Sequence, residues 1–247
     1  MKNIKKIINY FILGLLICIF LTACGKPAAD SKSVDYGQLK GDFSGITPEI
    51  AKAYLAVIDE LSAHLGYSET EASEGECLHG GFVLDWDGDK KPELCLLLKT
   101  SPRDSGGWEG IPVYGWYPPT LYLYTYRNGQ AVRVGECDLY FATAGREAAV
   151  AALISGNGMQ YVRWEYNTFE NAGYVSCYEL KDGTLQKREL PAEVADAAKG
   201  AETAQAFLNA LGPGKAQLLL YNNSGEAKIE GQANARELRA ALAAKAS

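Results

Sequence analysis

The feature that most constrains the fold is a run of short, turn-separated strand patterns between residues 77 and 190. Aromatic and β-branched residues are frequent there, and Gly, Asn and Asp interrupt them at short intervals. Two interruptions, Asn128-Gly129 and Asp182-Gly183, are dipeptides typical of two-residue hairpin turns. The pattern predicts strands near residues 79–85, 93–99, 120–127, 130–137, 148–155, 159–167, 173–180 and 184–190. Since strands joined by short turns usually pair, the sequence predicts an antiparallel meander.

Helical patterns flank this region on both sides. Apolar residues recur at spacings of three and four in residues 47–66, where Thr47 is a suitable N-cap and Pro48 suits the first turn. Residues 191–212 are Ala-rich and predict one or two helices broken at Gly200. A strand at 215–222 and a terminal helix at 233–245 complete the pattern. The predicted fold class is α+β: an N-terminal helix, an antiparallel β-meander and Ala-rich C-terminal helices.

The N-terminus predicts export. Three lysines precede an apolar stretch that is short for a bilayer span. Leu21-Thr22-Ala23-Cys24 follows and resembles the lipobox of bacterial lipoproteins, which implies cleavage before Cys24 and a diacylglycerol on its thiol. Two acyl chains give stable anchoring. The alternatives are an exported protein with a chance cysteine and an uncleaved anchor.

This layout predicts three parts and an address. A signal peptide occupies residues 1–23, a flexible tether residues 24–45, and a single α+β domain residues 46–247, β-rich over 77–190 and Ala-rich and helical over 191–247. The expected location is the extracellular face of a Gram-positive-type cytoplasmic membrane, with the lipid anchor as the contact to the membrane.

Charge and cysteine usage exclude some partners. The formal net charge is −6, and removing residues 1–23 would take away three of the 24 basic residues and none of the 30 acidic ones, leaving −9. Such a chain is a poor candidate for nucleic acid, where phosphate contacts dominate affinity. The cysteines left after Cys18 and Cys24, at positions 77, 95, 137 and 177, lie in apolar strand patterns, so buried thiols and disulfides both remain open.

The stretch FVLDWDGDKKPELCLLL, residues 82–98, carries the clearest candidate site. If Asp85 is position 1, then Asp87, Asp89, Lys91 and Glu93 are positions 3, 5, 7 and 9. Calcium takes six to eight oxygen ligands, and such a loop can supply carboxylates at alternate positions and the Lys91 carbonyl. Leu96 stands where an EF-hand needs its bidentate Glu. A structural calcium held between two strands is therefore the expected cofactor.

The same stretch resembles the DxDGDGxxEL loop of secreted and lipid-anchored Gram-positive proteins, and the calcium loops of integrin-type β-propeller repeats. In the first group the loop follows an N-terminal helix and precedes a strand like LYLYTYRNG, residues 121–129. The resemblance implies fold and address rather than an activity. This chain has Lys90 where the pattern has glycine, which disfavours the turn and opposes a cation. A bound ion, a weak or vestigial site and a plain polar turn all remain open.

Residues 101–119 form a long aromatic loop. Trp108, Tyr114, Trp116 and Tyr117 could bind a cell-wall glycan or a protein ligand, since aromatic side chains dominate recognition surfaces. Alternatively, the loop folds back over the sheet and leaves its tyrosines half-buried. Tyrosines at positions 122, 124 and 126 then share one face of the next strand.

No catalytic constellation is convincing. His64 and His79 belong to no paired motif, and the known nucleophile, zinc and phosphate-loop motifs are missing. Asp104 and Glu109 are a weak candidate for a glycosidase-like pair. The sequence predicts a non-catalytic binding or interaction module. The alternatives are an extracellular hydrolase acting through the aromatic loop and, less favoured, a transporter's substrate-binding component.

Overall fold

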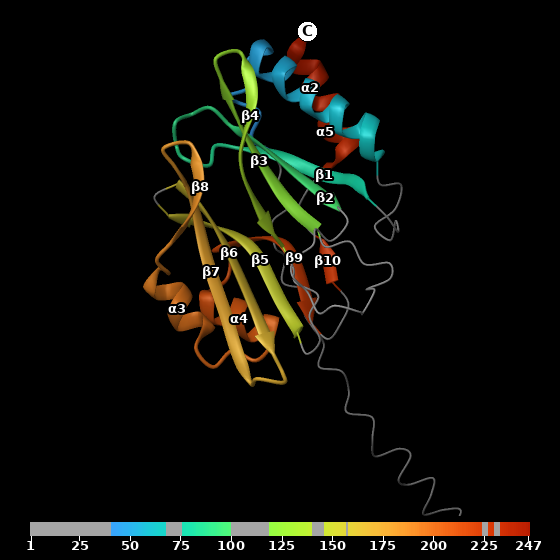
Figure 1. Cartoon of the computed structure of the whole chain (residues 1–247). Coiled ribbons are helices and arrows are strands. Elements are labelled where there is room, and N and C mark those ends of the chain that lie inside the picture. The colour runs from blue at the N-terminus through green and yellow to red at the C-terminus, as the bar shows by residue number, and fades with distance from the viewer. Residues whose placement is uncertain are drawn as a thin grey trace, which may run out of the picture. The chain divides into compact units, whose positions relative to one another are not determined.

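A computed structural model of the chain describes residues 41–67, 76–99, 119–139, 146–156, 158–223, 227–229 and 233–247. All of them belong to one compact unit, Tyr36–Ser247. The described residues contain four helices and two antiparallel sheets, which confirms the predicted α+β class (Figure 1).

The first sheet has five strands in the order β11-β1-β2-β3-β4. Its strands are β1 (Cys77–Leu84), β2 (Glu93–Lys99), β3 (Pro119–Arg127), β4 (Gln130–Asp138) and β11 (Ala233–Asn234). Every pairing is antiparallel, and the β1–β2 hairpin brings Leu84 opposite Glu93. The loop that carries the aspartates therefore closes this hairpin.

The second sheet has six strands in the order β10-β9-β5-β6-β7-β8. Its strands are β5 (Arg146–Gly156), β6 (Gly158–Asn167), β7 (Ala172–Lys181), β8 (Thr184–Arg188), β9 (Ala216–Asn223) and β10 (Ala227–Ile229). β9 lies beside β5, although about sixty residues separate them in the chain.

The helices pack on the outer faces of the two sheets. α2 (Pro48–Leu65) and α5 (Ala235–Ala246) lie side by side on the five-stranded sheet, and α3 (Ala192–Ala198) and α4 (Ala204–Leu211) lie on the six-stranded sheet (Figure 1). Each helix pair covers an apolar core on its sheet, and a further apolar core fills the space between the two sheets. The order of layers is helix pair, sheet, sheet, helix pair.

Two central strands show why both sheets must be covered on both faces. In β2, Leu94 and Leu96 face α2 and α5, whereas Cys95 and Leu97 face the other sheet. β5 is also apolar and buried on both faces. Its odd-numbered alanines and Leu153 face the first sheet, and its even-numbered residues face α3 and α4. Side chains alternate along a strand, so a run that is apolar throughout needs two apolar partners.

The predicted single meander is wrong in one respect. Neighbouring strands do pair from β1 to β4 and from β5 to β8, but the chain changes sheets between β4 and β5. The terminal helix is also not part of the Ala-rich layer with α3 and α4. Because β11 pairs with β1 at Gly80 and Gly81, the chain reaches the first sheet before α5 begins.

Burial bears on one question that the sequence left open, the state of the cysteines. The cysteines at positions 77, 95, 137 and 177 are buried and carry thiols rather than disulfides. The tyrosines of β3 lie beneath α2, with Tyr122 buried and Tyr124 and Tyr126 partly buried. The Arg133 guanidinium lies 4.2 Å from the centre of the Tyr122 ring.

Candidate metal-binding site

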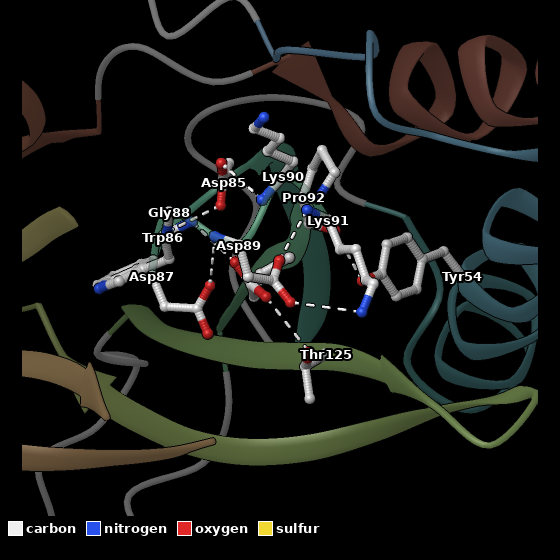
Figure 2. A network of polar contacts seen from close by, with 11 residues as sticks. Tyr54, Asp85, Trp86, Asp87, Gly88, Asp89, Lys90, Lys91, Pro92 and Thr125 are labelled. Carbon is white, nitrogen blue, oxygen red and sulfur yellow. Dashed lines mark hydrogen bonds and ion pairs between the residues drawn. The ribbon is translucent and has the colours of Figure 1, made fainter. Parts of the chain in front are cut away.

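The acidic loop, residues 85–92, joins β1 to β2. Asp85 follows β1 directly, and its carboxylate is turned over the loop. Asp85 Oδ1 accepts a hydrogen bond from the Gly88 N–H at 2.9 Å, and Oδ2 accepts one from the Lys90 N–H at 3.1 Å. One side chain thus organises the first six residues of the loop (Figure 2).

The other two aspartates repeat this arrangement on a smaller scale. Asp87 Oδ1 accepts the Asp89 N–H at 3.1 Å, and Asp89 Oδ1 accepts the Lys91 N–H at 2.7 Å. Aspartate side chains commonly accept from backbone two residues ahead in turns. The bonds hold each carboxylate in place relative to the loop backbone.

The result is a group of three carboxylates at one point of the surface. One oxygen from each of Asp85, Asp87 and Asp89 lies within 4.8 Å of the other two. Calcium binds oxygen at 2.3–2.6 Å, so two of its ligands are at most about 5 Å apart. Asp85 is half-buried and the other two are exposed, so the group could accept a cation from solution.

Lys90 lies at the turn position that the resemblance assigns to glycine. Its φ is +69°, in the left-handed region, and Gly88 has φ +81°. A side chain at such a φ is disfavoured by roughly 1–2 kcal/mol. The loop therefore has the turn expected at this position but with a residue that strains it.

Glu93, the fourth expected side-chain ligand, is not part of the group of three. It is 1 % exposed, and both of its oxygens accept hydrogen bonds from the protein. The Trp86 N–H donates to Oε2 at 2.8 Å, and the Thr125 hydroxyl donates to Oε1 at 3.2 Å. Glu93 joins the inner side of the acidic loop to β3 through these two hydrogen bonds.

The electrostatics of the loop favour protons or a cation. Burial, with the charges of Asp87 and Asp89 in addition, raises the pKa of Glu93 to about 7. Loss of water around the carboxylate, followed by the charges of Asp89 and Asp85, raises the pKa of Asp87. Lys91 offsets part of this charge through an ion pair with Asp89 at 3.6 Å, but both groups are largely exposed, so the pair contributes little.

Three further contacts tie the acidic loop to its surroundings. The buried Tyr54 hydroxyl on α2 donates to the Pro92 carbonyl at 2.8 Å. The Trp86 carbonyl accepts the Met159 N–H of β6 at 2.8 Å, which links the loop to the second sheet. A Cβ at Gly45 would lie 2.5 Å from the Lys90 carbonyl oxygen, so the segment before α2 approaches the loop too closely for a side chain.

The described structure brings together only part of the predicted site. Asp85, Asp87, Asp89, Lys91 and Glu93 all lie in or beside the acidic loop. Several predicted positions lie outside the described residues: the lipidation site Cys24, the aromatic residues Trp108, Tyr114, Trp116 and Tyr117, and the pair Asp104 and Glu109. His64 is exposed in the last turn of α2, and His79 is partly buried in β1.

The sequence did not identify the residues that bind the inner side of the acidic loop, namely Tyr54, Trp86 and Thr125. One signal was available, because Glu93 has the same parity along β2 as Cys95 and Leu97, which face the other sheet. That parity predicts an inward-facing carboxylate with protein partners. Gly45 carried no comparable signal.

No family model, curated protein or solved structure matches the chain. Among the residues that the structure describes, no helix is both long enough and apolar enough to cross a membrane.

Proposed function

We propose that the protein is a lipid-anchored module on the extracellular face of the cytoplasmic membrane, which binds a ligand without transforming it. The acidic loop takes a calcium ion that is structural. The observation that supports the ion is the group formed by Asp85, Asp87 and Asp89, whose oxygens lie within 4.8 Å of one another.

The contacts around the loop support a structural rather than a catalytic ion. Its inner side is fastened to α2 through Pro92, to β3 through Glu93 and to the second sheet through Trp86. A cation on the outer side would neutralise the three carboxylates that the backbone holds together. Extracellular calcium at millimolar concentration can fill even a weak site of this kind.

The anchor and the address rest on the sequence. The basic start, the short apolar stretch and the sequence LTAC ending at Cys24 are the features of a lipoprotein signal. Exposure to extracellular calcium follows from this address. The two parts of the proposal are therefore compatible, but they fail or succeed in different experiments.

The ion is tested by thermal unfolding with and without millimolar calcium, on protein that begins at residue 25 and so lacks the lipid. Calcium should raise the Tm, and Asp87→Asn should remove that rise while leaving the apo Tm equal or higher. The matched control is Asp182→Asn, since Asp182 also lies in a hairpin turn with φ +52° but outside the acidic group.

A Tm that stays constant in calcium would leave the loop as a polar turn held by its own hydrogen bonds. A calcium effect that Asp87→Asn and Asp182→Asn retain equally would place the ion elsewhere. Magnesium at the same concentration is a further control, because it demands shorter bonds and octahedral geometry.

The anchor is tested by fractionating cells that express the wild type or Cys24→Ala. The wild type should partition with the membrane after cleavage, and the variant should be released or remain as an uncleaved precursor. Normal cleavage and unchanged partitioning of the variant would refute lipidation.

The binding role is tested on glycan and peptide arrays, with Trp116→Ala beside the wild type. Binding without turnover would support a module. Turnover of a bound glycan or peptide would instead support the hydrolase that the aromatic loop left open.

A further inference from the structure

Three of the four edges of the two sheets are covered, interrupted or short in the described structure. On the outer edge of β1, the Asp42 N–H donates to the Val83 carbonyl and β11 pairs with the middle of the strand. The Leu78 N–H donates to the Gly66 carbonyl at the other end. β4 contains a bulge where it pairs with β3, and β10 has only three residues. Proteins block sheet edges in such ways because free backbone groups bind further strands.

The fourth edge, β8, is open. β8 is the last strand of the second sheet and pairs with β7 on one side only (Figure 1). Within the part of the chain that the structure describes, no backbone hydrogen bond reaches its other side. Three of its five residues are exposed, and the other two are partly buried.

The register of the β7–β8 hairpin shows which backbone groups are free. Asp182-Gly183 is a two-residue turn with positive φ at both positions, so Lys181 and Thr184 form a hydrogen-bonded pair. Bonded and non-bonded pairs alternate from there along an antiparallel ladder. The N–H and C=O groups of Leu185 and Lys187 therefore point away from β7, toward the open side.

Two cations lie along this edge. Lys187 is exposed and has the same parity as Leu185, whose side chain packs against the core between the sheets. Arg127 reaches the β7–β8 turn from β3, and a Cβ at Gly183 would overlap its Nη2 atom. The guanidinium thus takes the place of a side chain at Gly183, four residues before Lys187. Four residues of strand span about 13 Å.

The chain's own carboxylates do not pair with these two cations. Neither Lys187 nor Arg127 takes part in an ion pair of the described structure. The nearby Glu179 is paired with Arg188 at 2.8 Å. The chain has 30 acidic and 24 basic residues, so carboxylates are in excess elsewhere. Lysine on an edge strand can also serve to repel other strands. An edge of that kind would bind no peptide, which separates the two interpretations.

We propose that β8 binds an extended acidic segment of another protein, which joins the second sheet as a further strand. Its backbone pairs with the free groups of Leu185 and Lys187, and its carboxylates contact Lys187 and Arg127. In such strand addition, main-chain hydrogen bonds supply affinity and alternate side chains supply specificity. This ligand class rests on the binding role proposed above, but it depends on neither the calcium ion nor the aromatic loop.

The open edge is tested by amide hydrogen exchange of the purified, ¹⁵N-labelled protein, followed by NMR. The N–H groups of Thr184 and Gln186 bond to β7 and should exchange slowly. Those of Leu185 and Lys187 should exchange at least about tenfold faster. Equal protection of all four groups would mean that the edge is already covered, and this result overturns the proposal.

Binding is tested by selecting a displayed library of random nine-residue peptides on the purified protein. The selected peptides should be rich in Asp and Glu. The same peptides with Asn and Gln in their place should bind at least about fivefold more weakly. A bound peptide should also slow the exchange of the Leu185 and Lys187 amides. A selection that yields no binding peptide, or only peptides without acidic residues, overturns the proposal. The tests of the calcium ion and of Trp116→Ala are unaffected by either result.

Variants of Lys187 place the selected peptides on the edge. Lys187→Glu should weaken their binding about tenfold, whereas Lys199→Glu, the same change at an exposed lysine after α3, should alter it less than about twofold. Lys187→Pro removes the outward N–H as well as the charge, and proline is tolerated on an edge strand. It should bind the peptides more weakly than Lys187→Thr, which removes only the charge. Equal binding by Lys187→Glu and Lys199→Glu would refute the site.

Discussion

The acidic loop and the two-residue turns close hairpins by different physical means. Asn128-Gly129 and Asp182-Gly183 turn the chain in two residues, each with positive φ from 50° to 84°, as the twist of a tight hairpin requires. The loop between β1 and β2 has eight residues, and side-chain oxygens rather than glycines hold most of its shape.

This difference indicates that a longer hairpin loop needs acceptors for its unpaired backbone N–H groups. A two-residue turn leaves few backbone groups unpaired, so backbone conformation alone suffices. The acidic loop has several N–H groups without ladder partners, and three aspartates accept them, which concentrates negative charge. The loop is also joined to the core through Trp86 and Glu93, whereas neither short turn carries a buried side chain.

The largest expected effect comes from removing the core contact that distinguishes the loop. Trp86 is 1 % exposed, although aspartates flank it on both sides. Trp86→Ala should lower the free energy of unfolding by about 3–5 kcal/mol, because it leaves a large cavity between the sheets. Urea unfolding measures the loss. Val132→Ala, at a residue 40 % exposed on β4, should cost far less, and equal losses would contradict the role of Trp86.

The next effect is a pH dependence that the short turns lack. The pKa of Glu93 rises from its ordinary value of 4.5 to about 7 on folding, so the folded state holds this proton more tightly. Binding of this proton stabilises the folded state fully below pH 4.5, and the stabilisation is lost as the pH rises through 7. The free energy of unfolding changes by about 3 kcal/mol over this range. The raised pKa of Asp87 acts in the same direction.

Glu93→Gln keeps an acceptor for the Trp86 N–H but cannot ionise. Its amide nitrogen can donate to the Thr125 hydroxyl, which in the wild type donates to Glu93. The stability of this variant should change much less than that of the wild type between pH 5 and pH 8, as followed by urea midpoints. The variant should be the more stable of the two at pH 8. A wild type whose stability rises over this range would contradict the assignment.

The smallest effect concerns the backbone at Lys90. Lys90→Gly should raise stability by about 1 kcal/mol, since it relieves the left-handed strain, less the entropy that glycine loses on folding. Asn128→Gly should change stability by less than about 0.5 kcal/mol, because asparagine tolerates positive φ. A Lys90→Gly variant less stable than the wild type would show that the lysine side chain, not the strain, dominates.

The local pattern of the sequence predicted the strands well but not their assembly. The strand predicted at 93–99 is β2 to the residue, and that at 148–155 lies within β5. Alternation reveals that a strand has two buried faces but not which elements cover them. The position of β9 beside β5 and the change of sheets after β4 depend on contacts distant in the chain, and β11 is too short to show a pattern.

The candidate site was likewise predicted from local spacing only in part. The spacing of Asp85, Asp87 and Asp89 predicted three carboxylates in one place, and they lie within 4.8 Å of one another. The spacing also suggested Glu93 as a ligand, whereas its carboxylate accepts from Trp86 and Thr125. Thr125 is on another strand, so no local pattern could identify it as the partner.

The close approach at Gly45 has a mechanical consequence. The Asp42 N–H donates to the Val83 carbonyl on β1 at 3.0 Å, and Gly45 lies against the Lys90 carbonyl and Pro92. A pull on the chain before Gly41 is therefore transmitted first to the β1–β2 hairpin. We expect the contacts of residues 42–45 to give way under such a pull before the strands of the first sheet separate, because one backbone hydrogen bond joins Asp42 to β1 whereas a ladder of hydrogen bonds joins β1 to β2.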